Sequence, residues 1–127
     1  MKAYLLVFLG AGIGGIMRHA LSGAGSRLLG ASFPVSTLVV NVVGSVLMGV
    51  LAGYFAARTG LPQHLRLFLA TGILGGFTTF SAFSFEAAIL IQRQQYGLAG
   101  TYVAASLFLA IAGFFAGLAL IGGTRLS

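Results

Sequence analysis

The stretch GILGGFTTFSAFSFE, residues 72–86, interrupts a long apolar run with weak helix formers. Gly75 and Gly76 are adjacent and Thr78 and Thr79 follow them, and both residue types disfavour a helix. We therefore predict a membrane helix that is broken near its middle. Carbonyls at such a break survive only inside protein or along a cavity. They suit a small hard cation such as Na⁺, as in broken-helix transporters; a glycine kink for packing alone is the alternative.

The composition of the whole chain assigns it to the membrane. Of its 127 residues, 58% are hydrophobic and 6% are charged, and the mean hydropathy is +1.05. Soluble domains carry about 25% charged residues, so a soluble globule is excluded, and the chain is too apolar for disorder. The net charge of +6 comes from bases placed singly between apolar runs, which argues against nucleic-acid binding. Without cysteine, disulfides and thiolate metal sites are excluded.

Four apolar runs predict four membrane helices in a single domain, residues 1–127. Each run is long enough to cross roughly 30 Å of hydrocarbon. We expect the spans at about residues 3–20, 34–57, 64–92 and 98–121, with residues 22–33 as the longest loop. The predicted fold class is an all-α membrane protein with four transmembrane helices.

Lysine and arginine residues are almost evenly divided between the two sides of the membrane. One side would hold Lys2, Arg58, Arg66 and Arg125, and the other would hold Arg18, Arg27 and Arg93. Since positive loop charge sets orientation, the chain could insert either way up, and two opposite copies could pair as an antiparallel dimer. A weak bias that fixes one orientation is the alternative. Four short helices pack their own core, so transport would need an oligomer.

Neutral polar side chains form stripes on the second and fourth spans. Thr37, Asn41 and Ser45 are four residues apart and share one helix face. Polar groups at this depth face protein or water and tend to be functional, although an interhelical hydrogen bond by Asn41 is an equal alternative. Tyr102 and Ser106 share a face of the fourth span in the same way.

Phenylalanines at helical spacing follow the predicted break. Phe77, Phe80 and Phe83 are three residues apart, and Ser81 and Ser84 alternate with them. The edge of an aromatic ring carries positive partial charge, so ring edges beside hydroxyl donors form a weak anion ligand. Ordinary core packing is the alternative.

The remaining titratable residues do not predict an enzyme. Glu86, the only acid, is either a proton carrier or, as we favour, a charge-balancing residue that Arg18 or Arg93 neutralises. His19 and His64 have no partner at metal-ligand spacing. The chain has no aspartate for a Ser-His-Asp set and no phosphate-binding loop.

Together these residues resemble the small fluoride channels of bacteria, the Fluc or CrcB family. The resemblance covers nearly the whole chain and rests on the glycine-rich first helix ending in Arg18, on residues 41–45 with Gly49, and on residues 75–86. It implies a multi-pass protein of the cell inner membrane that passively exports fluoride and so lowers its intracellular concentration. It also implies an antiparallel, dual-topology homodimer with two pores. Ala110 departs from the pattern, because relatives often carry another hydroxyl there.

The resemblance further implies roles for individual residues. A structural Na⁺ at the dimer interface, which is not transported, would be held by the backbone carbonyls of Gly75 and Thr78. Arg18 would lie near a pore entrance, and Glu86 would serve charge balance. The fluoride path would be lined by Asn41, Phe80, Phe83, Ser106, Tyr102, Thr37, Thr79, Ser81 and Ser84.

Two other functions stay open. A proton-coupled small multidrug exporter can also be a four-span antiparallel dimer, but it needs an embedded carboxylate, and Glu86 alone could supply one. A non-transporting membrane assembly subunit would explain the many small residues on the helix faces. The expected partners are fluoride, a second copy of the chain and membrane lipid, and not nucleic acid.

Overall fold

The computed structural model describes residues 1–29, 34–58 and 60–122, and all regular structure within them is helical. Four stretches in this part of the chain are long and apolar enough to cross a membrane. The prediction of an all-α chain with four spans is therefore confirmed. In chain order the elements are α1 (Lys2–Leu29), α2 (Val35–Ala57), α3 (Gln63–Arg66), the π-helix η1 (Leu67–Leu74), α4 (Gly75–Phe77), α5 (Phe80–Gln92) and α6 (Tyr96–Leu120).

The bounds of the first span differ most from the prediction. We expected this helix to end near residue 20, but α1 continues to Leu29, so the prediction of a loop beginning at residue 22 was wrong. Small residues there allow close approach to the next helix: a Cβ on Gly25 would collide with the side chain of Ser36. Residues 30–33 of the expected loop lie outside the described residues.

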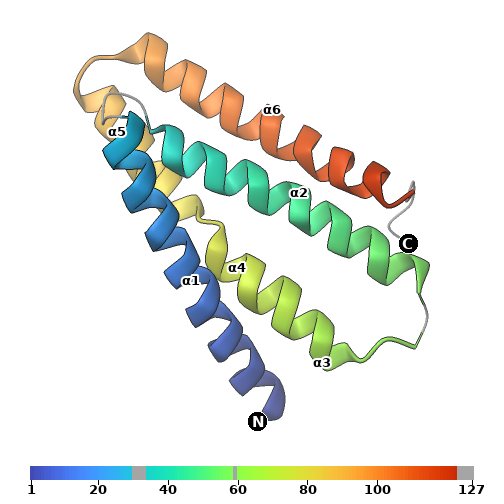
Figure 1. Cartoon of the computed structure of the whole chain (residues 1–127). Helices are drawn as coiled ribbons and strands as arrows, with labels where there is room; N and C mark the ends of the chain where they lie inside the picture. Colours follow the sequence, from blue (N-terminus) through green and yellow to red (C-terminus); the bar gives the residue numbers. More distant parts are fainter. Residues whose placement is uncertain (30–33, 59, 123–127) are drawn as a thin grey trace.

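The helices form two close pairs that diverge from the region of the break (Figure 1). In one pair α1 packs along η1 and α4, and in the other α2 packs along α6. Glycines make both contacts possible, because a Cβ on Gly10 would lie 2.7 Å from the carbonyl oxygen of Phe68. A Cβ on Gly117 would collide with the carbonyl of Val46 in the same way. Such backbone-to-backbone packing is typical of helices in lipid.

The third span is broken, as the sequence predicts, and the break falls on its two threonines. Thr78 (φ −82°, ψ 154°) and Thr79 (φ −150°, ψ 116°) are extended. Gly75 remains helical (φ −62°, ψ −38°), and Gly76 lies so close to α1 that a Cβ would collide with Ala11. Gly76 therefore serves helix packing, whereas a Cβ on Gly75 would make only ordinary contact, and the two threonines form the interruption. The π-helix immediately before the break was not predicted; such turns often occur at functional sites.

Candidate ion site at the break in the third span

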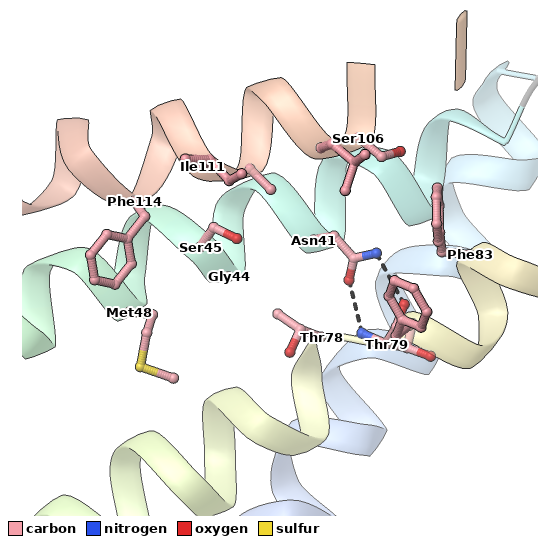
Figure 2. Close-up of a pocket in the computed structure, with 13 residues that line it drawn as sticks. Asn41, Gly44, Ser45, Met48, Thr78, Thr79, Phe83, Ser106, Ile111 and Phe114 are labelled. Atoms are coloured by element: carbon pink, nitrogen blue, oxygen red, sulfur yellow. Dashed lines mark hydrogen bonds between the residues drawn. The ribbon is translucent and has the colours of Figure 1, made fainter. Parts of the chain in front are cut away.

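The side chain of Asn41 on α2 makes two hydrogen bonds to the backbone of one residue at the break, Thr79. Its Oδ1 accepts a hydrogen bond from the backbone N–H of Thr79 at 2.8 Å, and its Nδ2 donates to the Thr79 carbonyl at 3.1 Å. Figure 2 shows both bonds reaching from α2 to the extended segment. Because extended backbone at membrane depth needs polar partners, the Asn41 amide replaces bonds that the broken helix cannot make.

The side chains of the two threonines finish one helix and start the next. The hydroxyl and the N–H of Thr78 both donate to the carbonyl of Leu74, each at 3.0 Å, and so end α4. Thr79 is the N-cap of α5: its Oγ1 accepts from the N–H of Ala82 at 3.2 Å. The same hydroxyl lies 3.3 Å from Oγ of Ser81. Caps of this kind satisfy amides that have no intrahelical acceptor.

These bonds leave two carbonyls without their ordinary helical donors. In a continuous helix the N–H of Thr79 would donate to the carbonyl of Gly75, four residues earlier. The N–H of Ala82 would likewise donate to the carbonyl of Thr78. Here the first N–H donates to Asn41 and the second to the Thr79 hydroxyl. Backbone oxygens released from a broken helix are a donor set that Na⁺ accepts, so the residues at the break fit that ion chemically.

Arg18 on α1 bonds a neighbouring carbonyl at the break. Its Nε donates to the carbonyl of Gly76 at 3.3 Å. Because α1 runs on to Leu29, Arg18 lies inside the helix and is half-buried, whereas the sequence placed it at a helix end. Its role near a pore entrance stays a prediction.

A cavity of about 340 Å³ lies against the break, between α2, α5 and α6. In Figure 2 the polar groups of Asn41, Thr79 and Ser106 gather toward one end, while Met48 and Phe114 lie at the other. Among the described residues that line the cavity, none is charged. The lining consists of Asn41, Gly44, Ser45, Met48, Thr78, Thr79, Phe80, Phe83, Ser106, Leu107, Ala110, Ile111 and Phe114.

Ser106 lines this cavity and carries a hydroxyl that has no hydrogen-bond partner among the described residues. The residue is 8% exposed, and its Oγ is buried without a hydrogen-bond partner in the part of the chain that the structure describes. Leaving a buried polar group unpaired costs about 1–3 kcal/mol. A buried hydroxyl without a protein partner beside a cavity marks a place where a ligand or water can bind.

Aromatic rings continue from the cavity toward α6. Phe83 is buried, and its ring centroid lies 5.3 Å from that of Phe80 and 5.2 Å from that of Tyr102. Phe80 lines the cavity, yet it is 74% exposed. The cavity wall formed by Phe80 is therefore uncovered in a single copy of the chain.

Glu86 lies beside these rings and accepts two hydroxyl hydrogen bonds. Thr37 donates to its Oε1 at 2.8 Å, and Tyr102 donates to its Oε2 at 2.9 Å. We had expected Arg18 or Arg93 as its partner. The hydrogen bonds instead come from α2 and α6, and Arg18 bonds the backbone of the break.

The comparison with known families settles the relationship of the chain. A family model described as "CrcB-like protein, Camphor Resistance (CrcB)" matches residues 5–118. The chain belongs to the CrcB family. The resemblance noted in the sequence is thereby confirmed, and the four spans are those of a multi-pass membrane protein.

Relatives in the CrcB family are similar over almost their full length. A protein from Rhodopseudomonas palustris (strain BisB5), named fluoride-specific ion channel FluC, is 59% identical over 118 residues, which are 93% of this chain and 95% of the relative. Proteins of the same name from Methylobacterium nodulans and Granulibacter bethesdensis are 54% and 49% identical, over 92% and 95% of this chain and 94% and 95% of their own lengths. All three names describe ion channels and not enzymes.

The structure gathers many of the expected site residues of this CrcB-family chain. Asn41, Thr79, Phe80, Phe83 and Ser106 line the cavity with Thr78. The side chains of Thr37 and Tyr102 meet at Glu86, one helical turn away from Asn41 and Ser106. Ser81 and Ser84 are exposed on α5 and are not among the residues that line the cavity.

Several lining residues were missed because their chemistry is that of any membrane core. Met48, Leu107, Ile111 and Phe114 form the apolar part of the cavity. Only their position near Asn41 in the folded protein sets these residues apart from other apolar residues of the helices. No sequence signal could have identified them. Ser45, by contrast, lines the cavity on the stripe that its spacing from Asn41 predicts.

Proposed function

We propose that this chain forms a fluoride-selective ion channel that passively exports fluoride from the cytoplasm and lowers its intracellular concentration. A relative named fluoride-specific ion channel FluC is 59% identical over 93% of this chain. The structural observation that carries the proposal is the uncharged cavity at the break. Its wall includes Ser106, whose buried hydroxyl has no partner in the part of the chain that the structure describes.

The lining of this cavity suits a small, strongly hydrated anion. Fluoride leaves water only if hydrogen-bond donors replace its hydration shell, and Ser106 and Asn41 offer neutral donors. The ring edges of Phe80 and Phe83 add weak positive partial charge. Conduction requires binding that is favourable yet weak enough for release, which neutral donors provide better than a buried arginine would.

Passive flow is sufficient for export. Hydrogen fluoride crosses lipid as a neutral acid and ionises inside a less acidic cytoplasm, where the anion is trapped. A negative-inside membrane potential drives an anion outward by about 2.3 kcal/mol per 100 mV. A selective pore therefore removes fluoride without an energy-coupling domain.

The functional unit that we propose is an antiparallel, dual-topology homodimer with two pores. Phe80 lines the cavity while 74% exposed, and Gly75 is exposed at the break, so a second copy can cover both. Arg18 bonds the break inside the protein and no longer counts toward either side. The basic residues in the loops and near the span ends then number four against two, which remains a small difference.

We further propose a structural Na⁺ between the two copies. The carbonyls of Gly75 and Thr78 from each chain would hold it, because their helical donors are diverted. A bound cation would contribute a positive potential close to the anion path. The ion itself would not be transported.

Fluoride efflux from liposomes that contain this protein alone tests the proposal. We expect rapid loss of fluoride, almost no loss of chloride, and strongly reduced fluoride loss with Phe80→Ile. Equal leakage of both halides would refute selectivity, and the absence of any ion flux would favour the assembly subunit. Proton-driven export of organic cations that is abolished by Glu86→Gln would favour the multidrug exporter.

A further inference from the structure

We infer that Asn41 and the Thr79 hydroxyl are positioning residues that divert the helical donors of two carbonyls at the break, those of Gly75 and Thr78, without binding an ion there themselves. The inference rests on the Na⁺ site proposed above and assigns its formation to two side chains. Asn41 binds the N–H that would otherwise bond the carbonyl of Gly75. The Thr79 hydroxyl binds the N–H that would otherwise bond the carbonyl of Thr78.

Asn41 acts by competing with the helix for one amide. An N–H makes one strong hydrogen bond, and the N–H of Thr79 donates to Oδ1 of Asn41 at 2.8 Å. A side chain of similar volume without an oxygen at position 41 would leave that N–H unpaired at membrane depth, which is costly. Its nearest helical acceptor is the carbonyl of Gly75. When the Asn41 side-chain amide is replaced, the N–H of Thr79 therefore bonds the carbonyl of Gly75, and that oxygen is no longer available to Na⁺.

The Thr79 hydroxyl acts in the same way one turn later. It accepts the N–H of Ala82 at 3.2 Å, which in a continuous helix would bond the carbonyl of Thr78. Thr79→Val keeps the branched shape and removes the acceptor. The N–H of Ala82 then turns to the carbonyl of Thr78, and that oxygen is lost to the ion.

Na⁺ affinity of the purified protein tests both steps, measured by equilibrium binding after dialysis into a large organic cation. We expect Thr79→Val and Asn41→Leu each to weaken Na⁺ binding by about 10- to 100-fold, the usual effect of losing an outer-shell partner. Thr101→Val is the matched control, because the Thr101 hydroxyl bonds the carbonyl of Gly97 on α6, away from the break. It should leave Na⁺ affinity unchanged.

A backbone change separates this mechanism from general damage to the fold. An ester in place of the peptide bond between Thr78 and Thr79 removes the competing N–H, so no donor can return to Gly75. The ester also weakens the carbonyl of Thr78 as a ligand, so each variant is compared with its own parent. Asn41→Leu should lower Na⁺ affinity in the all-peptide protein but leave it almost unchanged in the ester protein. A carbonyl ¹³C resonance of Gly75 that shifts toward its hydrogen-bonded position in Asn41→Leu, and shifts back with the ester, would show the exchange directly.

The outcomes distinguish this inference from the proposed function. Unchanged Na⁺ affinity in both Thr79→Val and Asn41→Leu overturns the inference and leaves the Na⁺ site standing. An equal loss of Na⁺ affinity from Asn41→Leu with and without the ester overturns the step assigned to Asn41, whereas Thr79→Val tests the other step independently. A wild-type protein that binds no Na⁺ overturns both the site and the inference, while fluoride efflux still decides the channel function.

Discussion

The phenol of Tyr102 on α6 donates a 2.9 Å hydrogen bond to Oε2 of Glu86 on α5. The second carboxylate oxygen accepts from Thr37 on α2. The only acid of the chain thus joins three helices through hydroxyl groups. This cluster lies one helical turn from Asn41 and Ser106, so it braces the α2 and α6 walls of the cavity.

Removing the phenol should weaken the protein measurably. We expect Tyr102→Phe to lower the free energy of unfolding by about 0.6–1.7 kcal/mol, between the average and the maximum measured for hydrogen bonds between membrane helices. Reversible unfolding in detergent would measure it. In a Glu86→Ala background the same substitution should cost clearly less, because the acceptor is already absent. Equal costs in the two backgrounds would show that the pair is not coupled.

The unpartnered hydroxyl of Ser106 should matter for transport and not for stability. Ser106→Ala removes a group that makes no bond within the described chain, so unfolding free energy should stay the same or rise by up to about 1 kcal/mol. Fluoride efflux should fall about tenfold, which corresponds to a lost interaction of about 1.4 kcal/mol. Thr101→Ala, on the exposed side of the same helix, is the control with unchanged efflux. Normal efflux in Ser106→Ala would remove this hydroxyl from the path.

Gly44 should tolerate no side chain while Thr78 keeps its methyl group. A Cβ at position 44 would collide with Cγ2 of Thr78 and lie 3.3 Å from the ring of Phe77. Gly44→Ala should therefore cost about 1–3 kcal/mol of stability, as overpacking does. Thr78→Ser removes the methyl group but keeps the hydroxyl bonded to Leu74, so it should partly rescue Gly44→Ala. Thermal unfolding of the single and double variants would measure this, and additive losses would contradict the packing argument.

Dual topology can be measured directly because the chain has no cysteine. Gln63→Cys would place one thiol at the exposed start of α3. If copies insert both ways up, a membrane-impermeant thiol reagent should label about half of them from each side of intact vesicles. Labelling from one side only would rule out the antiparallel dimer.

Apolar run length was sufficient to predict the second, third and fourth spans. Each begins and ends within about two residues of the predicted position. Gly75, Gly76, Thr78 and Thr79 also located the break in the third span. The end of α1 was wrong because glycine and serine, which are typical of loops, here bring a long helix close to its neighbour.

The sequence showed which residues are polar and able to form the site, but it did not show which of them hydrogen-bond to one another. Thr37, Asn41 and Ser45 were predicted to share a face, and two of them line the cavity. Thr37 and Tyr102 were not predicted as partners of Glu86, because opposite charge suggested arginine, whereas helix packing brings these two hydroxyls to the carboxylate. Contacts between residues 38 or more positions apart depend on how the helices cross, which spacing along one helix does not encode.

The order of Asn41 and Thr79 along the chain has a consequence for biogenesis. Asn41 precedes Thr79 by 38 residues, so α2 has left the ribosome before the broken span emerges. The amide that seals the interruption is therefore synthesised first. As the third span enters the bilayer, the N–H and carbonyl of Thr79 can bond Asn41 on α2, which is already present, and so avoid exposure to hydrocarbon.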